Sequence, residues 1–357
     1  MSTSQIPIQN VYYLLAYAWK HYRRGEERNI SAVDCPDSLN LLAHLLAQAV
    51  PGAVKRGVDR EYVVKTETTA SLRGRFDLVG SYRTLTHLSG KLICEFDELT
   101  SDTLPNQIVK STCLRLLRSS QPLTRINKSG IRLAADLFEG VSKISISDRT
   151  FRKVQLHHNN RHYRLLMNIC ELLHHCHTPD AKSGRDRFSN FLDDDRLMAT
   201  IFEEFVREFA AQHVVGAKVK AMHINWRGIW DDEISEVIPK MITDVTIDHP
   251  EHKTILDCKF YRKALVTRED RKRLHSSHLY QLTAYLQNKS RDDGWEHVRG
   301  VLLYPAVNHH LNLKFELLGF PVEIQSVDLD QPWRSIHDQL FKLVCGSVRE
   351  TTPPKFD

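Results

Sequence analysis

The stretch that decides the fold runs from Asp244 to Phe260 and reads DVTIDHPEHKTILDCKF. Two short apolar segments joined by the polar residues DHPEHK predict a β-hairpin. Side chains alternate between the faces of a strand, so Ile255, Asp257 and Lys259 are expected on one face. The preceding strand can bring Asp244 beside them. The hairpin therefore predicts a cluster of two carboxylates and one lysine, in positions where a half-buried strand normally carries apolar side chains.

Such a cluster has a specific chemical use. Two neighbouring carboxylates repel each other and are costly to bury unless a cation compensates them. Oxygen ligands of this kind suit Mg²⁺, with Mn²⁺ as the alternative ion, and phosphate oxygens can complete the coordination. A lysine alongside can stabilise an attacking hydroxide or hold the scissile phosphate. The pattern D-x12-D-x-K thus indicates metal-dependent phosphodiester hydrolysis, although by itself it equally describes an exposed hairpin with an Asp–Lys pair, which is commoner.

The segments around the hairpin are ordered as in a mixed α/β domain. A long amphipathic helix over 195–213 carries Glu203 and Glu204. A helix over 278–287 follows the hairpin and carries Gln281 and Tyr285, which lie four residues apart and so share a face. Further elements are a last helix over 333–344 and strands over 217–224, 237–247, 254–261, 298–307, 312–318 and 322–328.

The first half of the chain has a different pattern. Short alternating segments with turn residues between them predict a small antiparallel β unit around residues 55–99. Apolar residues at helical spacing predict helices over 11–19, 38–50, 104–117 and 162–175. The polar stretch 178–190 is the best candidate for a linker or an exposed loop. We therefore predict an α/β (α+β) protein with an N-terminal domain over 1–178 and a second domain over 179–357.

Composition excludes several classes of protein. The chain has 357 residues with a formal net charge of +5, which is compatible with a nucleic-acid partner. We find no secretory signal pattern and no apolar run near the ~20 residues that a membrane helix needs. The seven cysteines are scattered and mostly lie in apolar segments. They are expected to be reduced core thiols of a cytoplasmic protein.

One histidine cluster suggests a second metal site. His174, His175, Cys176 and His177 are consecutive. Structural zinc needs two separated pairs of ligands, and a second pair at suitable spacing is missing. We therefore interpret the cluster as the end of a helix with solvent-facing histidines.

The order of elements resembles the core of PD-(D/E)XK nucleases: a helix with an acid, a strand with Asp244, a strand with Asp257-x-Lys259, and a helix with Gln281-x3-Tyr285. Thr243 departs from this pattern, because it stands where the proline that names the family would be. Over nearly the whole chain the sequence resembles the McrC family, the nuclease subunits of GTP-driven McrBC restriction systems that cut methylated DNA. The similar segments include IPIQNVYYLLAYAW, TETTASLRGRFDL, EFDELTSDTLPNQIVKSTCLRLL, FEEFVREF, ITDVTI, ILDCKFYRK and HLYQLTAYL.

The resemblance implies roles for individual residues. Asp244 and Asp257 would bind the metal, with the backbone carbonyl of Cys258 as a further ligand. Lys259 would be the catalytic lysine. Glu203 would be the acid of the first nuclease helix and a further metal ligand, although a surface carboxylate is the commoner interpretation. Gln281 and Tyr285 would support the site or contact the DNA backbone, and packing of this helix face on the sheet is an equal alternative.

The resemblance also implies partners. An McrB-like AAA+ GTPase hexamer would bind GTP and recognise methylcytosine in double-stranded DNA, and the complex could dimerise. This chain lacks the phosphate-binding motif G-x4-G-K-[ST], so GTP should act only through the partner. The N-terminal domain is the candidate for docking on that ring. The basic strip 261–278 could contact DNA phosphates. The alternative functions are a non-catalytic assembly or activator subunit of the ring and a stand-alone PD-(D/E)XK nuclease.

Overall fold

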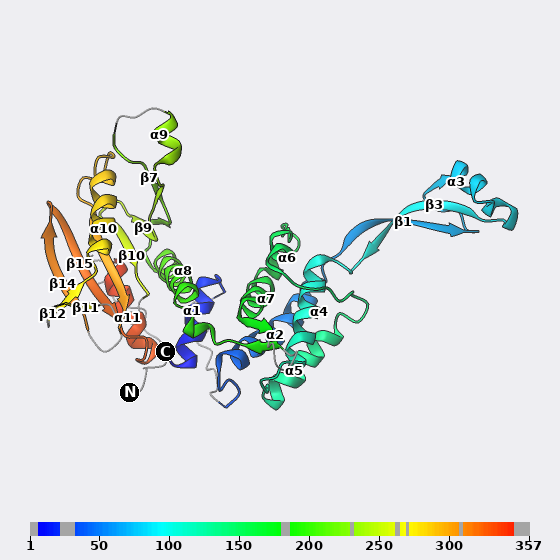
Figure 1. Cartoon of the computed structure of the whole chain (residues 1–357), viewed down its shortest axis with the longest axis horizontal. Helices are drawn as coiled ribbons and strands as arrows, with labels where there is room; N and C mark the ends of the chain where they lie inside the picture. Colours follow the sequence, from blue (N-terminus) through cyan, green and yellow to red (C-terminus); the bar gives the residue numbers. More distant parts are fainter. Residues whose placement is uncertain are drawn as a thin grey trace. The chain divides into compact units, whose positions relative to one another are not determined.

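The computed structural model describes residues 6–21, 33–179, 186–228, 232–260, 265–268, 271–306 and 310–345. The chain forms two compact units (Figure 1). Unit 1 combines Met1–Ser38 with Asn190–Asp357, and unit 2 is Leu39–Ser189. Because the first 38 residues belong with the second half of the chain, the structure divides differently from the predicted domains 1–178 and 179–357.

Unit 1 is built on a six-stranded mixed sheet with the strand order β14-β15-β13-β10-β9-β6. β10 is parallel to β13 and antiparallel to β9, and β13 is parallel to β15. β14 and β6 are antiparallel to their neighbours. The strands are β6 (Lys218–Lys220), β9 (Val245–Asp248), β10 (Lys253–Cys258), β13 (Arg299–Pro305), β14 (Asn312–Leu317) and β15 (Phe320–Val327). The expected α/β class is confirmed.

Helices cover both faces of this sheet. α10 (Ser276–Lys289) packs on β10 and β13, and Ile255 of β10 lies in the same apolar core as Leu282 and Leu286 of α10. Side chains alternate along a strand, so Leu256 faces the other side, where α8 (Asp195–His213) lies. Gly300 of β13 permits the close approach of α10, because a Cβ there would lie 2.7 Å from Leu286 Cδ1.

The N-terminal helix α1 (Ile8–Ala18) is part of unit 1. It packs against α8 and α11 (Trp333–Cys345). The Tyr13 and Trp333 rings stack with centroids 4.2 Å apart, and Tyr17 Oη lies 3.0 Å from His213 Nε2. These contacts explain why α1 belongs to unit 1 and not to the first predicted domain. A helix that is apolar on nearly every side must be buried on all of them, and α8 and α11 from the second half of the chain bury it.

A single buried amide fastens α1 to the C-terminal part of the unit. Asn10 Nδ2 donates to the carbonyls of Leu329 and Gln331, each at 2.8 Å. We expect Asn10→Ala to lower the free energy of unfolding by about 2–3 kcal/mol, because it leaves these carbonyls without their donor. Thermal unfolding measures this effect. Lys342→Ala, at an exposed position of α11, is the control, and an unchanged melting temperature for Asn10→Ala would contradict this account of α1.

Unit 2 consists of a helical body and a long β arm (Figure 1). The body contains α2 (Ser38–Arg56), α4 (Leu104–Leu117), α5 (Arg125–Asp136), α6 (Asp148–Arg152), the 3-10 helix η2 (Arg161–Tyr163) and α7 (Arg164–Cys176). We call residues 61–100 the arm. They form β1 (Glu61–Thr69), β2 (Arg75–Asp77), α3 (Leu78–Arg83), η1 (Thr86–Ser89) and β3 (Leu92–Thr100), with the antiparallel strand order β1-β3-β2. The predicted antiparallel β unit around 55–99 is confirmed.

Three predicted segments differ from the structure. The strand expected at 237–247 is wrong: α9 (Asp232–Val237) is followed by β8 (Met241–Ile242) and, after a break, by β9. The strand expected at 217–224 is β6 followed by β7 (His223–Ile224), and β7 pairs with β8 in a separate ribbon. The break at Thr243 and Asp244 lets the chain pass from one sheet to the other. The stretch 178–190, expected to be a linker, contains the end of β4 (His177–Pro179) and β5 (Asp186–Phe188).

Residues 261–264 and 269–270 of the basic strip 261–278 lie outside the described residues. Its described backbone forms β11 (Leu265–Arg268), β12 (Arg271–Leu274) and the start of α10. Among the described helices, none has both the length and the apolar character that crossing a membrane would require.

Candidate active site

A buried carboxylate marks the end of the central strand β10. Asp257 has 0% exposed surface, because its strand is flanked by β9 and β13. Lys259 follows directly after β10, and its N–H donates to the carbonyl of Leu303 on β13 at 2.9 Å. Lys259 Nζ lies 3.0 Å from Asp257 Oδ2. The strand end thus holds an ion pair between residues two apart in the chain.

Asp244 comes from the break between β8 and β9. Its Oδ2 accepts from the N–H of Cys258 at 2.7 Å, and its backbone carbonyl accepts from Arg207 Nη1 of α8 at 3.0 Å. Thr243 just before it is buried, and its Oγ1 lies 2.7 Å from Thr246 Oγ1. The hydrogen bonds on both sides fix the Asp244 carboxylate beside the end of β10.

α10 adds a chain of hydrogen bonds to the lysine. Lys259 Nζ donates to Gln281 Oε1 at 2.9 Å, and Gln281 Nε2 donates to Tyr285 Oη at 2.7 Å. Tyr285 Oη in turn donates to the carbonyl of Ile242 at 2.8 Å. Ile242 lies two residues before Asp244. The chain therefore couples the position of the ammonium group to the backbone that carries the carboxylate.

The carboxylates of this site have raised pKa values, chiefly because they are buried. Burial, opposed by Lys259 and assisted by Asp244, raises the pKa of Asp257 to about 7. Burial also raises the pKa of Glu203 to about 7, and the neighbouring Asp244 adds to this. The pKa of Asp244 is raised by burial as well. The protein alone supplies too little positive charge to hold three ionised carboxylates here.

The donor groups fit a hard divalent cation. Neither oxygen of the buried Asp257 carboxylate has a hydrogen-bond partner of good geometry. The Asp257 and Asp244 carboxylates and the Cys258 carbonyl would offer oxygen donors alone, which is the set that Mg²⁺ prefers. In the part of the chain that the structure describes, no three Asp, Glu, His or Cys side chains already form a metal cage. A cation would therefore rely on few protein ligands and on oxygens from water or substrate.

The structure brings the residues singled out in the sequence to one place. Asp244, Asp257, Lys259, Gln281 and Tyr285 are linked by the contacts above. Glu203 is half-buried on α8 and interacts electrostatically with Asp244 and Lys259. Their catalytic roles stay predictions.

Two further residues of the site escaped the sequence analysis. Arg207, which holds the Asp244 carbonyl, lies four residues after Glu203 and so on the same helix face, which is a signal that could have been used. His278 precedes Gln281 on α10, and its Nδ1 lies 2.8 Å from Tyr304 Oη. Burial, with the nearby Lys259 as a second cause, lowers the pKa of His278 to about 4. No short motif in the sequence points to this histidine.

The histidine cluster at the end of α7 pairs with other side chains. Asp148 Oδ1 lies 3.2 Å from His174 Nε2 and 3.5 Å from His175 Nε2. His177 is buried, and its ring contacts the Leu173 carbonyl. The expectation of solvent-facing histidines is therefore wrong for His177, because the chain turns from α7 into a strand at this point.

Comparisons with known proteins point to one family. The model of the family described as "McrBC 5-methylcytosine restriction system component" matches residues 9–305. The Escherichia coli (strain K12) protein described as "Type IV methyl-directed restriction enzyme EcoKMcrBC" is 28% identical over 344 residues, or 96% of this chain and 98% of that protein.

One solved structure supports the fold. A half-complex from a tetradecameric assembly of Thermococcus gammatolerans McrB AAA+ hexamers with bound McrC matches with a TM-score of 0.55 and 17% identity, over 94% of this chain and 75% of that one. A structure of the Thermococcus gammatolerans McrBC complex matches 58% of this chain and 59% of that one, with 21% identity and a TM-score of 0.42.

Proposed function

Because the chain belongs to the McrBC 5-methylcytosine restriction system component family, we propose that it is the nuclease subunit of such a system. It would cut double-stranded DNA with the help of Mg²⁺, as a Mg²⁺-dependent endodeoxyribonuclease. It would work with a separate AAA+ GTPase ring that hydrolyses GTP and recognises the modified base. Its place of action would be the cytoplasm, and its seven free cysteines are compatible with that location.

The observation that carries this proposal is the buried carboxylate pair beside a fixed lysine. Asp257 lies 3.0 Å from Lys259, and Asp244 is held against Cys258 by a hydrogen bond of 2.7 Å. Asp257 lacks a hydrogen-bond partner of good geometry, which is costly unless something else compensates the charge. A cation and an anionic phosphate together would compensate both the carboxylates and the lysine.

The roles of the side chains follow from their contacts. Asp244 and Asp257, with the Cys258 carbonyl and Glu203, would hold the metal. When bound, Mg²⁺ supplies Lewis-acid polarisation of the phosphate and lowers the pKa of water. The Lys259 ammonium stabilises the extra negative charge that develops on the phosphate oxygens. Gln281 keeps this ammonium in place.

Protons and the metal ion would compete for the same carboxylates, which gives a test of the proposed metal ligands. Asp257 and Glu203 have pKa values of about 7, so both are largely protonated at pH 6 and ionised at pH 8. A cation needs the ionised forms, so its binding must displace these protons at low pH. We expect the Mg²⁺ concentration that gives half-maximal DNA cleavage to rise by about 10- to 100-fold from pH 8 to pH 6, tenfold for each proton displaced.

The measurement is a Mg²⁺ titration of cleavage by the chain together with its ring partner, GTP and methylated DNA. Calorimetry of Mg²⁺ or Mn²⁺ uptake by the chain alone is the independent readout. Asp248→Asn, at the opposite end of β9, is the control and should keep the same pH dependence. A half-maximal Mg²⁺ concentration that does not change with pH would contradict the proposed ligands.

The arm favours the proposed dependence on a partner over a nuclease that acts alone. Large apolar side chains are exposed along its whole length, on β1 as well as on α3 and η1. A high density of exposed apolar side chains is typical of protein interaction sites. We infer that the arm binds the GTPase ring and stimulates its GTP hydrolysis. This activator role would coexist with cleavage.

A further inference from the structure

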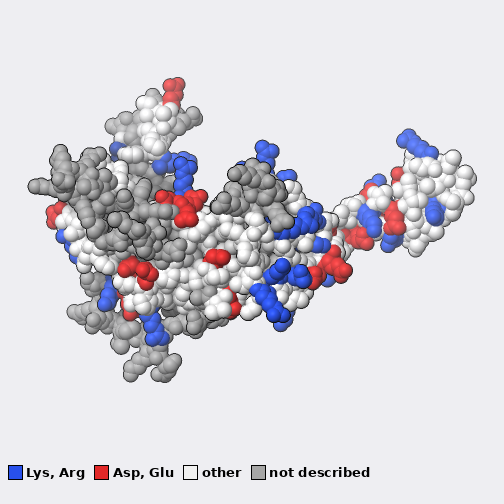
Figure 2. All heavy atoms as spheres, turned by 60° about the horizontal axis from the view of Figure 1, so that its bottom comes forward, with Lys and Arg blue, Asp and Glu red and all other residues white. Residues whose placement is uncertain are grey.

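The two units carry opposite net charge. Residues 39–189, which form unit 2, contain 23 Lys and Arg against 14 Asp and Glu. The remaining residues contain 26 Lys and Arg against 30 Asp and Glu. The unit without the candidate active site is therefore the basic one, and Figure 2 shows Lys and Arg side chains in several groups on it. Such asymmetry suggests a polyanionic partner for unit 2.

The most basic part of unit 2 is the segment 149–164. This segment contains five Lys and Arg, three histidines and neither Asp nor Glu. The five cationic side chains are exposed. In the described part of the chain none of the five forms an ion pair or a side-chain hydrogen bond. We call them the free cations: Arg149, Arg152, Lys153, Arg161 and Arg164.

Three other basic residues of the unit are paired within the protein. Lys65 lies 3.0 Å from Glu98, and Arg73 lies 2.5 Å from Glu67. Lys110 Nζ donates to the carbonyls of Glu139 and Val141. The free cations differ from these three residues in that their charge is still available for an outside anion, and they are the densest basic group in the sequence of the unit.

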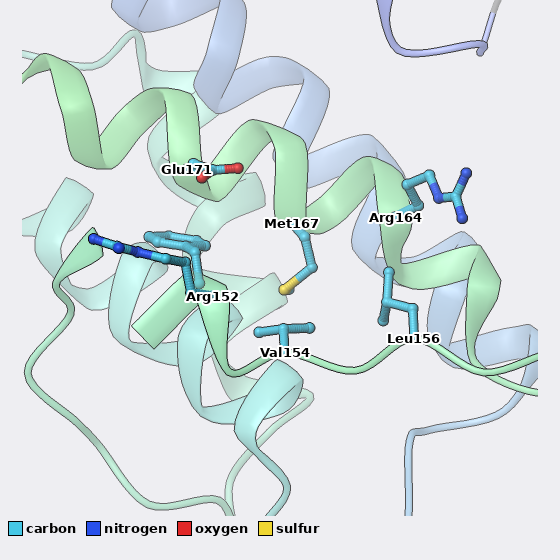
Figure 3. A pocket seen from close by; sticks show the side chains of 7 residues that line it. Arg152, Val154, Leu156, Arg164, Met167 and Glu171 are labelled. Atoms are coloured by element: carbon cyan, nitrogen blue, oxygen red, sulfur yellow. The ribbon is translucent and has the colours of Figure 1, made fainter. Parts of the chain in front are cut away.

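Two of the free cations border a pocket of about 430 Å³. Val154, Leu156 and Met167 provide an apolar lining, and Glu171 is the one acidic residue that lines it. Figure 3 shows Arg152 and Arg164 on opposite sides of this lining, at the end of α6 and at the start of α7. A guanidinium can hold a phosphate through two parallel hydrogen bonds, and an apolar surface between two such groups suits a deoxyribose.

The exposed surface distinguishes this segment from the arm. Within residues 149–164, all of which are described, no large apolar side chain is exposed, whereas the arm exposes many. Protein interfaces are enriched in aromatic and apolar side chains at their centre. Surfaces for DNA are more polar and more positively charged. The charge pattern here fits DNA better than an acidic protein.

We propose that the free cations of segment 149–164, with the pocket between Arg152 and Arg164, bind the sugar–phosphate backbone of duplex DNA. This inference rests on the proposed function, because it takes the DNA cut by unit 1 as the ligand. Unit 2 then has two surfaces with different partners: the arm for the ring protein and the basic segment for DNA. Backbone contacts carry no sequence information, so this surface binds methylated and unmethylated duplexes alike.

The test compares DNA binding by the full-length chain at several salt concentrations, without divalent metal so that no cleavage occurs. Fluorescence anisotropy with a labelled duplex gives the affinity between about 50 and 200 mM salt. The double variant Arg152→Ala/Arg164→Ala should reduce the slope of log affinity against log salt by about 1 per arginine, or about 2 in all. Affinity should fall equally for methylated and unmethylated DNA.

Lys65→Ala/Arg73→Ala is the matched control, because it removes the same charge from paired residues of the same unit. Equal effects of the two double variants, or no effect of either, would overturn the proposal. So would loss of ring binding with unchanged DNA affinity, which would identify an acidic protein surface as the ligand. Absence of DNA binding by the unaltered chain at low salt would also overturn it. Metal uptake at Asp257 is independent of all these outcomes, so failure here is distinguishable from failure of the proposed nuclease.

Discussion

Asp257→Asn is expected to reduce DNA cleavage by at least about 10³-fold. The substitution keeps the size and shape of a side chain with 0% exposed surface but removes the charge that would hold the cation. Cleavage of methylated DNA in the presence of the ring partner, GTP and Mg²⁺ measures the effect. Calorimetry should show the loss of Mg²⁺ or Mn²⁺ uptake at the same time.

The fold should survive this substitution. A neutral amide in place of a buried, poorly compensated carboxylate costs little and can even stabilise the metal-free protein near pH 8. Ring binding and GTPase stimulation should therefore stay at the level of the unaltered chain. Asp248→Asn serves again as the control, because Asp248 pairs with Lys253 at the turn end of the same hairpin. An Asp257→Asn variant that cuts at the normal rate would show that Asp257 is not part of the active site.

Charges on the arm should abolish assembly. Val79 and Leu88 are 63% and 75% exposed in α3 and η1, and Figure 1 shows α3 at the end of the arm that lies away from the helical body of unit 2. The double variant Val79→Asp/Leu88→Asp would place two carboxylates in the contact with the ring, where burying them unpaired is costly. We expect binding to weaken at least about 100-fold, with loss of GTPase stimulation, since central apolar contacts dominate interface energy.

The control for the arm is Ile126→Asp on α5. This side chain is 61% exposed, so the substitution has similar chemistry on another surface of the same unit. Gel filtration and GTPase assays with the purified ring measure both variants. Normal stimulation by the Val79→Asp/Leu88→Asp chain would show that the arm is not the activating contact.

Much of this organisation could be predicted from the sequence. The strand with Asp257 and the helix with Gln281 and Tyr285 have clear periodicity, so these elements follow from simple spacing rules. The arm was likewise evident, because alternation and turn residues are local signals. The family resemblance then gave these residues candidate roles that periodicity alone could not give.

The rest depends on contacts between distant parts of the chain. The placement of α1 could not be predicted, because Asn10 contacts the carbonyls of Leu329 and Gln331, more than 300 residues away. The break before Asp244 was missed because Thr243 is a good strand residue, and its non-strand conformation comes from contacts with Met222 and Thr246. The pairing of His278 with Tyr304 is also non-local.

The insertion of unit 2 into unit 1 also has a consequence for biosynthesis. Ser38 Oγ donates to Asn190 Oδ1 at 2.7 Å, so the chain leaves unit 1 and re-enters it at neighbouring points. On the ribosome α1 emerges first, but α8 and α11, which bury it, are translated only after the whole inserted unit. Unit 2 can complete its own core in the meantime. The nascent helix α1 must therefore keep its apolar surface uncovered until translation is almost finished, which makes it the segment of the newborn polypeptide most in need of a chaperone.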